Sequence, residues 1–468
     1  MAVSVKSNIF YNILLTCSSY IVSLLVFPYI SRILGVDNIG AVGFVNKAID
    51  IFMLFTTLGV SVVGVREIAL HKDDEKDLDK VFSGLVTALL ICTVVVTIIY
   101  LFSIYSVQKF RNYELLFLVG TARLLTSFFY IEWFFQGVEK FKYIAIRGVV
   151  VRVIYVLSVF FFVHDSSDVN IYYYLTTLSV IANGLINWIS AKKIVHFSFA
   201  FKQARSYFKP LFSFGLYTIL NATFSTCNYL FIGFLCTDRE VGYYSTAESL
   251  YRLFLSLISA CTSVLLPRMS YLVSLNDKDA FDITVNNSFN YLLALCLPLS
   301  IFGIFNAEQI IRVIAGPGYE GAIIPLQIMM VLILMNAINQ VFIIQVAIPH
   351  SLDKYITIGT AIASVISIPL NYYLVKDFGA LGSSIVLVFS IIIANALPIY
   401  VLLQKKILKF PKDIFVKQII NTIPYFIISI AFVLIHLENP FAHLIWVSGL
   451  YTIVFLFINK SLILKIVK

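Results

Sequence analysis

Long apolar runs constrain this chain more than any other feature of its sequence. About fourteen such runs, of about 17 to 28 residues each, follow one another with short polar turns between them, and the fourth run covers 113–136. Each run is long enough to cross the hydrocarbon core of a bilayer as an α-helix, whereas a membrane barrel would need alternating strands of about ten residues. Only 13 % of the residues are charged, about half the share in a soluble protein. The sequence therefore predicts an all-α polytopic membrane protein with about 14 transmembrane helices.

The distribution of lysine and arginine predicts how these helices cross the membrane. About 24 of the 34 cationic residues, Arg147 among them, are counted with connections on one side, and about six with connections on the other. The positive-inside rule assigns the richer side, and with it both termini, to the cytoplasm. Because this bias explains most of the net charge of +9, nucleic acid is not an expected partner.

The sequence gives no indication of catalytic or metal chemistry. The six cysteines lie in or beside apolar runs without a C-x-x-C spacing, and the six histidines are scattered over loops and helix ends. Motifs for nucleotide binding, zinc hydrolysis and serine catalysis are absent from the sequence. We therefore expect no enzyme, no metal and no cofactor.

Two weak internal echoes predict a repeated unit. The turn LGVDNIGAVGF at 34–44 is similar to LCTDREVGYYS at 235–245, and Lys142-Tyr143 recurs as Lys354-Tyr355. Offsets of about 200 residues favour two pseudo-symmetric six-helix lobes followed by two further helices. The predicted divisions are an N-terminal lobe at 1–195, a cytoplasmic inter-lobe connection at 196–209, a C-terminal lobe at 210–403 and the appended helices 13 and 14 at 404–468. The connection is basic and amphipathic, which is compatible with a surface helix or with a loop.

A small set of ionisable side chains falls inside the predicted spans. The set consists of Lys47, Asp50, Arg123, Glu132, Arg152, Glu248 and Arg252. Charge at membrane depth costs roughly 2.5 to 3.5 kcal/mol per side chain on insertion scales, so such residues usually face a bundle interior or a wet cavity. Lys47 and Asp50 share one helix face, and Glu248 and Arg252 do so in the second lobe. Arg123 and Arg152 have no carboxylate within four positions on their own helices.

These charges have two interpretations. Each close pair could neutralise itself as a packing contact. Alternatively, the cations line a water-filled cavity that receives an anion, because the guanidinium fork suits diphosphate oxygens and keeps its charge at physiological pH. On the second interpretation, Lys47, Arg123, Arg152 and Arg252 bind the substrate. Asp50 and Glu248 would then balance the charge of the empty site or bind a coupling cation.

The stretch from Phe27 to Ala69 resembles a known family. The pattern comprises Phe27-Pro28, Arg32, Leu34-Gly35, the acidic turn at 36–40, Leu58-Gly59 and Arg66-Glu67-Ile68-Ala69. These residues are similar to the opening of the Wzx-type polysaccharide or O-antigen flippases. Those flippases belong to the multidrug/oligosaccharidyl-lipid/polysaccharide exporter superfamily, together with the lipid II flippase and the MATE drug exporters.

The resemblance implies a MATE/lipid II flippase-like fold and a multi-pass protein of the bacterial inner membrane. It further implies a flippase that moves undecaprenyl-diphosphate-linked oligosaccharide units from the cytoplasmic to the periplasmic leaflet by alternating access. The product would be O-antigen (part of lipopolysaccharide), capsule or exopolysaccharide. Energy would come from a Na+ or H+ gradient or from the membrane potential. Besides the lipid bilayer, candidate partners are a polysaccharide polymerase and a chain-length regulator.

Two alternatives remain open from the sequence. A MATE-like exporter of drugs or metabolites shares the superfamily, but a pump for organic cations would favour an acidic and aromatic chamber. A membrane O-antigen polymerase or glycosyltransferase usually carries a sizeable external loop, and this sequence has no such loop.

Overall fold

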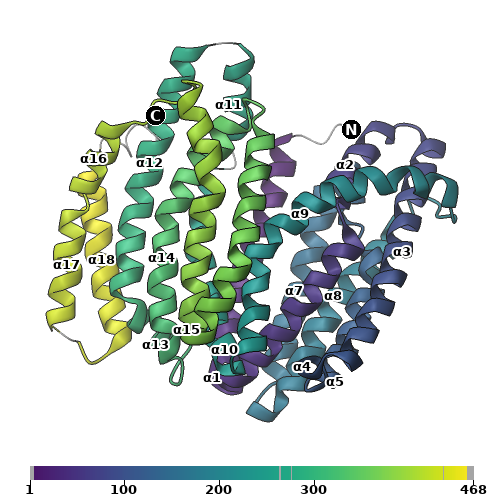
Figure 1. Ribbon diagram of the computed structural model, residues 1–468, viewed down its shortest axis with the longest axis horizontal. Coiled ribbons are helices and arrows are strands. Elements are labelled where there is room, and N and C mark those ends of the chain that lie inside the picture. Colours follow the sequence, from purple (N-terminus) through teal and green to yellow (C-terminus); the bar gives the residue numbers. More distant parts are fainter. Residues whose placement is uncertain (1–4, 263–264, 276, 436, 461–468) are drawn as a thin grey trace. The chain divides into compact units, whose positions relative to one another are not determined.

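A computed structural model describes residues 5–262, 265–275, 277–435 and 437–460, and every regular element within these residues is helical. Ten helices in this part of the chain are long and apolar enough to cross a membrane. The prediction of an all-α polytopic membrane protein is confirmed. By internal contacts the chain divides into two units, Met1–Phe234 and Leu235–Lys468 (Figure 1). The lobe divisions at 195, 209 and 403 stay predictions.

The first unit is a bundle arranged around α1. Its elements are α1 (Val5–Thr57), α2 (Val60–His71), α3 (Glu75–Ser106), α4 (Gln108–Arg111), α5 (Glu114–Leu125), η1 (Ser127–Phe129), α6 (Glu132–Gly137), α7 (Phe141–Phe162), η2 (Ser166–Asp168), α8 (Val169–Ala191) and all but the last residue of α9 (Phe201–Leu235). Helix α1 packs against α3, α5 and α7, and α8 packs against α5 and α7. A core of buried aromatic and aliphatic side chains, including Phe82 and Trp133, joins α2, α3 and α6.

The second unit is arranged around α12 and α14. Its elements are α10 (Asp238–Thr262), α11 (Leu265–Ser274), α12 (Lys278–Phe305), α13 (Ala307–Ile314), η3 (Glu320–Ala322), α14 (Ile323–Ile338), the π-helix η4 (Asn339–Ala347), α15 (Asp353–Gln404), α16 (Lys412–Ile420), α17 (Ile423–Ile435) and α18 (Pro440–Ile458). Helix α14 packs against α10, α12 and α15. Helices α17 and α18 pack together, and they contact α12 and α13 respectively.

The two longest helices each contain a break at a glycine. At 52 residues α15 is far longer than the roughly 20 residues of one crossing, and Gly379 near its middle has a φ of 51°, in the left-handed region. Gly359 and Ala394 lie side by side, since a Cβ on Gly359 would be 2.4 Å from the carbonyl oxygen of Ala394. Helix α15 is therefore a hairpin of two spans. Helix α1 is likewise interrupted at Gly35, which has a φ of 76°.

The second sequence echo has a structural counterpart. Glu139 and Ser351, each four residues before the repeated tyrosine, both have left-handed backbones with φ of 58° and 55°. At both turns the amide of this residue bonds the carbonyl three positions back, and the next amide bonds the carbonyl five positions back. This is the Schellman pattern that ends a helix. The shared geometry supports the internal repeat.

The basic connection at 196–209 combines an extended segment with a helix. The extended segment lies along α3. Every second backbone amide of the segment donates a hydrogen bond to an α3 side chain, and the accepting side chains are four residues apart. The bonded pairs are Asp79 with His196, Ser83 with Ser198 and Thr87 with Ala200. Helix α9 then begins at Phe201. Both interpretations from the sequence, loop and helix, thus apply to part of the connection.

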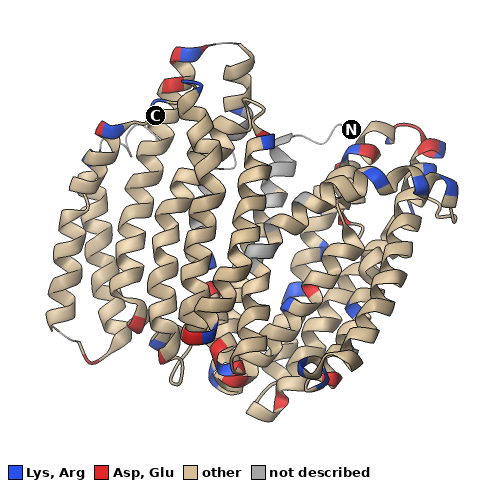
Figure 2. Cartoon of the chain, viewed as in Figure 1, with Lys and Arg blue, Asp and Glu red and all other residues tan. Residues whose placement is uncertain are grey.

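Charged residues are concentrated at the ends of the helices. Figure 2 shows Lys, Arg, Asp and Glu gathered near the two ends of each bundle, and long uncharged stretches between them. A few charged residues lie midway along the helices of the first unit. Those residues form the candidate site.

Candidate functional site

Arg123 of α5 bonds to one face of α1. Its Nη2 lies 3.0 Å from Oδ1 of Asp50, and its Nη1 donates to Oδ1 of Asn46 at 2.7 Å. The Arg123 side chain is only 14 % exposed, whereas that of Asp50 is 40 % exposed. The ion-pair partner of Asp50 is thus on another helix, and Lys47 lies instead 5.1 Å from the centroid of the Tyr229 ring. The amide of Asn46 completes the bonds of Arg123 to α1.

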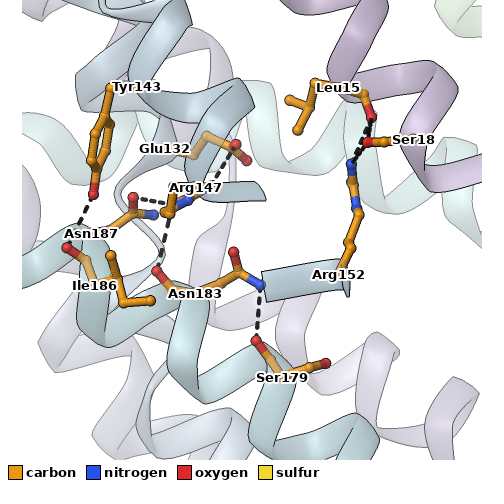
Figure 3. Close-up of polar contacts among 10 residues, drawn as sticks. All are labelled: Leu15, Ser18, Glu132, Tyr143, Arg147, Arg152, Ser179, Asn183, Ile186 and Asn187. Carbon is orange, nitrogen blue, oxygen red and sulfur yellow. Dashed lines mark hydrogen bonds and ion pairs between the residues drawn. The ribbon is translucent and has the colours of Figure 1, made fainter. Parts of the chain in front are cut away.

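Arg147 of α7 forms a second buried ion pair. Its Nη2 lies 3.1 Å from Oε1 of Glu132 on α6, and its Nη1 donates to Oδ1 of Asn187 on α8 (Figure 3). The Arg147 side chain is 7 % exposed. The sequence analysis counted Arg147 with a connection, but α7 begins at Phe141 and carries this residue into the bundle. Arg147 therefore joins α6, α7 and α8.

Arg152 is held by neutral groups. It lies five residues beyond Arg147 on α7, and in Figure 3 the two side chains point to different neighbours. The Nη1 of Arg152 donates to the carbonyl oxygen of Leu15 and to the Oγ of Ser18 on α1, both at 2.6 Å. No ion pair of Arg152 is found among the described residues. Arg152 interacts electrostatically with Glu132, which attracts it, and with Arg147, which repels it.

A break in the predicted fourth span brings these groups together. The sequence predicted one helix over 113–136, but α5 ends at Leu125 and α6 begins only at Glu132. Irregular backbone at membrane depth is tolerated where protein buries it or where it lines a polar cavity. Tyr130 in this break lies within electrostatic range of Arg123, Arg147 and Arg152. We call these three arginines, with Lys47, Asp50 and Glu132, the arginine cluster.

The arginine cluster has an excess of positive charge. Among its described side chains, four cations accompany two carboxylates, and both carboxylates are already paired with an arginine. Uncompensated charge inside a helix bundle is costly, and charged residues at membrane depth usually face a polar cavity or a partner. The arrangement is suited to binding an anion.

Arg252 and Glu248 lie in the second unit, on α10. The Nη2 of Arg252 is 2.6 Å from Oε1 of Glu248, at the i,i+4 spacing seen in the sequence. The Glu248 side chain is 5 % exposed and that of Arg252 is 53 % exposed. The structure thus brings Arg123, Arg152, Lys47 and Asp50 into one unit and pairs Arg252 with Glu248 in the other. The binding roles of these residues stay predictions.

Arg147 and Asn187 were not among the predicted site residues, and Glu132 was predicted to lie within a span but without a role in the site. A signal for Arg147 was available, because it stands in the apolar run IAIRGVVVRV only five residues before Arg152. Asn187 gave no such signal, since an isolated amide in a span is as often a packing contact.

Comparison with known proteins identifies the family of this chain. A family model described as "Polysaccharide biosynthesis protein" matches residues 5–273, more than half of the chain. The chain belongs to the polysaccharide biosynthesis protein family. This member is 24 % identical over 414 residues to the "Putative O-antigen transporter" of Escherichia coli (strain K12), covering 86 % of this chain and 98 % of that one. A protein of the same description from Shigella dysenteriae is 21 % identical over 396 residues, covering 82 % and 96 %.

Solved structures show the same fold for this family member. The lipid II flippase MurJ in an inward closed conformation superposes with a TM-score of 0.76 at 16 % identity, over 97 % of this chain and 100 % of that chain. An inward-facing MATE family multidrug resistance transporter of the MOP superfamily superposes with a TM-score of 0.61 at 16 % identity, over 86 % and 94 %. The predicted MATE/lipid II flippase-like fold is confirmed. The expectation of a multi-pass transporter and not an enzyme agrees with these relatives.

Proposed function

We propose that this protein flips undecaprenyl-diphosphate-linked oligosaccharide units from the cytoplasmic to the periplasmic leaflet of the bacterial inner membrane. The names of its sequence relatives and the lipid II flippase fold support a lipid-linked glycan as substrate. The observation that carries the proposal is the excess of positive charge in the arginine cluster, where four cations accompany two carboxylates. A diphosphate is the part of such a substrate that needs this charge.

The physical demand on the protein comes from the diphosphate. Moving even a singly charged ion of carboxylate size from water into a medium of low dielectric constant costs on the order of 20 kcal/mol by Born solvation, so the protein must supply a polar route for the diphosphate. The polyprenyl tail is apolar, so it can stay in the hydrocarbon core of the bilayer. The two predicted lobes, 1–195 and 210–403, would rock to expose the polar route to one side and then to the other.

The bonds within the arginine cluster suggest different roles for its members. Within the described part of the chain, the acceptors of Arg152 are the neutral groups of Leu15 and Ser18, and it can exchange them for phosphate oxygens without leaving a carboxylate unpaired. Arg123 can share its guanidinium between Asp50 and the substrate. In this proposal Lys47 and, in the second unit, Arg252 add further positive charge. Asp50 and Glu248 hold their arginines when the site is empty, or they bind a coupling cation.

The membrane potential favours this direction of transport. Moving negative charge outward across a membrane that is negative inside releases roughly 2.3 kcal/mol per charge per 100 mV. If the cluster fully offsets the charge of the substrate, the same gain appears when the empty, positively charged site returns inward. Both cases predict that the potential accelerates the cycle.

A deletion strain tests the proposed function. Without the protein, lipid-linked glycan should accumulate on the inner leaflet, and the wild-type chain should restore surface glycan. If the lipid-linked glycan reached the periplasmic leaflet in the deletion strain as it does in the wild type, the proposal would be wrong. If the protein were a polymerase, its deletion would give a different result, because unpolymerised single repeat units would still reach the cell surface.

The fold likeness to MATE transporters favours one alternative, the export of a drug or metabolite. The excess of cations in the first unit argues against an organic cation as cargo. Unchanged resistance to organic cations in the deletion strain, combined with loss of surface glycan, would separate the two functions.

A further inference from the structure

A polar cavity lies at one end of the second unit, separate from the arginine cluster. It has a volume of about 390 Å³ and lies between the α11–α12 connection, the turn between η4 and α15, and the turn between α15 and α16. The sequence bias in lysine and arginine assigns these three connections to the cytoplasmic side. The charged or titratable lining residues are Asp277, Lys278, Asp282, His350, Lys405 and Lys406. We call this space the lysine cavity.

Lys406 lies at the end of helix α15. Helix α15 ends at Gln404, and the amides of Lys406 and Ile407 bond the carbonyls of Leu403 and Leu402. In this helix ending the residue at the position of Lys406 is left-handed, and its φ is 54°. Glycine is the usual residue there because it has no Cβ. This helix ending places Lys406 in the lining of the cavity.

The neighbouring groups define donors and acceptors for a ligand. Lys405 adjoins Lys406, and its Nζ is 5.7 Å from the centroid of the Tyr355 ring. The Nδ1 of His350 lies 2.8 Å from the carbonyl oxygen of Val346. The ring centroids of His350 and Phe281 are 5.3 Å apart, and the two rings are nearly perpendicular. Since a carbonyl only accepts, Nδ1 carries the hydrogen, and Nε2 of the neutral ring is an acceptor.

The lysine cavity therefore combines cationic donors with acceptors over an apolar floor. Its three lysines can bind phosphate oxygens. The carboxylates of Asp277 and Asp282 can accept from hydroxyl groups, although Oδ1 of Asp277 already accepts from the amide of Ala280 at 3.1 Å. Leu272 and Phe281 are buried hydrophobic residues of the lining. Basic pockets between helices on the cytoplasmic side of membrane proteins commonly take lipid headgroups.

We propose that the lysine cavity binds a phosphoglycerol group, with its phosphate on Lys278, Lys405 and Lys406 and its hydroxyls on the two aspartates. The phosphoglycerol headgroup of an anionic lipid in the inner leaflet and free glycerol phosphate share this chemistry. The site does not depend on the proposed transport function.

Binding to the full-length protein in detergent tests this site. The probe is short-chain phosphatidylglycerol, titrated below its micelle concentration and measured by native mass spectrometry. The double variant Lys405→Gln/Lys406→Gly should weaken binding at least roughly tenfold, because two charge-assisted contacts are lost. Glycine at 406 suits the left-handed backbone, so this variant should keep its fold.

Matched variants and a second probe make the result decisive. Lys409→Gln/Lys412→Gln removes the same charge from two exposed positions, Lys409 in the same connection and Lys412 at the start of α16, and should leave the affinity unchanged. Equal weakening in both double variants, or in neither, would overturn the proposal. Glycerol 3-phosphate distinguishes the sources, since a lipid site should bind it far more weakly than phosphatidylglycerol and a soluble-phosphate site should bind both alike. If neither probe bound to the wild-type protein, the lysine cavity would not be a phosphoglycerol site, whatever the outcome for transport.

Discussion

The pair between Arg123 and Asp50 gives the sharpest test of the arginine cluster, because stability and transport should respond differently to its removal. Arg123→Ala deletes the guanidinium and leaves the Asp50 carboxylate and the Asn46 amide without the partner they now have. Breaking a fully buried ion pair costs about 3–5 kcal/mol, but Asp50 is 40 % exposed and water can solvate part of its charge. We therefore expect a loss of about 1–3 kcal/mol in the free energy of unfolding.

The double variant Arg123→Ala/Asp50→Ala removes the unpaired carboxylate as well. Because neither partner of the ion pair is then left behind, its stability should return to within about 1 kcal/mol of the wild type. Export of glycan should nevertheless stay lost, since the cation that binds the diphosphate is absent. Tryptophan fluorescence during thermal unfolding in detergent measures the first quantity, and surface glycan per molecule of inserted protein measures the second.

A matched pair on the surface controls for the removal of charge itself. Arg312 and Glu308 on α13 form an exposed ion pair at 2.6 Å, and Arg312→Ala/Glu308→Ala should change stability by less than about 1 kcal/mol and leave export intact. If the Arg123/Asp50 double variant exported glycan at the wild-type rate, the pair would be a packing contact only. If the Arg123/Asp50 double variant were as unstable as Arg123→Ala alone, the explanation of the instability by an unpaired Asp50 carboxylate would be refuted.

Two further predictions concern single residues, and a third concerns the membrane potential. Arg152→Ala should abolish export at normal protein abundance, whereas Arg205→Ala, at an exposed position on α9, should be silent; immunoblots of membranes and surface glycan decide this. Gly379→Ala should lower the free energy of unfolding by about 1–3 kcal/mol, because its backbone is left-handed and a Cβ would lie 2.3 Å from Oε2 of Glu240. By contrast, Gly449→Ala in α18 meets no atom within 4 Å and should be neutral or stabilising. Collapse of the membrane potential in proteoliposomes without an ion gradient should slow transport, and unchanged rates would reject the electrogenic step.

The helices could be predicted from sequence because the membrane itself imposes their length. A run of about 20 apolar residues has few alternatives in lipid, so hydropathy sufficed for most spans. The break between Leu125 and Glu132 was missed for the same reason, since the sequence there, SFFYIEW, is nearly as apolar as that of a membrane-spanning helix. Only the tertiary contacts show that the backbone leaves the helix there.

The candidate site was predictable as a set of residues but not as a set of bonds. Spacing along a helix correctly paired Glu248 with Arg252, which are four residues apart. The same logic placed Lys47 beside Asp50, whereas the ion pair of Asp50 comes from Arg123 on another helix. Pairing between helices depends on their packing, which a single sequence does not reveal.

The most direct test is the transfer of a labelled polyprenyl-diphosphate oligosaccharide across proteoliposomes that contain this protein alone. The account predicts that the wild-type protein moves the glycan from one leaflet to the other when a membrane potential is applied, and that Arg152→Gln, inserted in equal amount, does not. Transfer at equal rates by both proteins would contradict the assignment of the arginine cluster to the diphosphate, and the absence of transfer by the wild-type protein would contradict the proposed function itself.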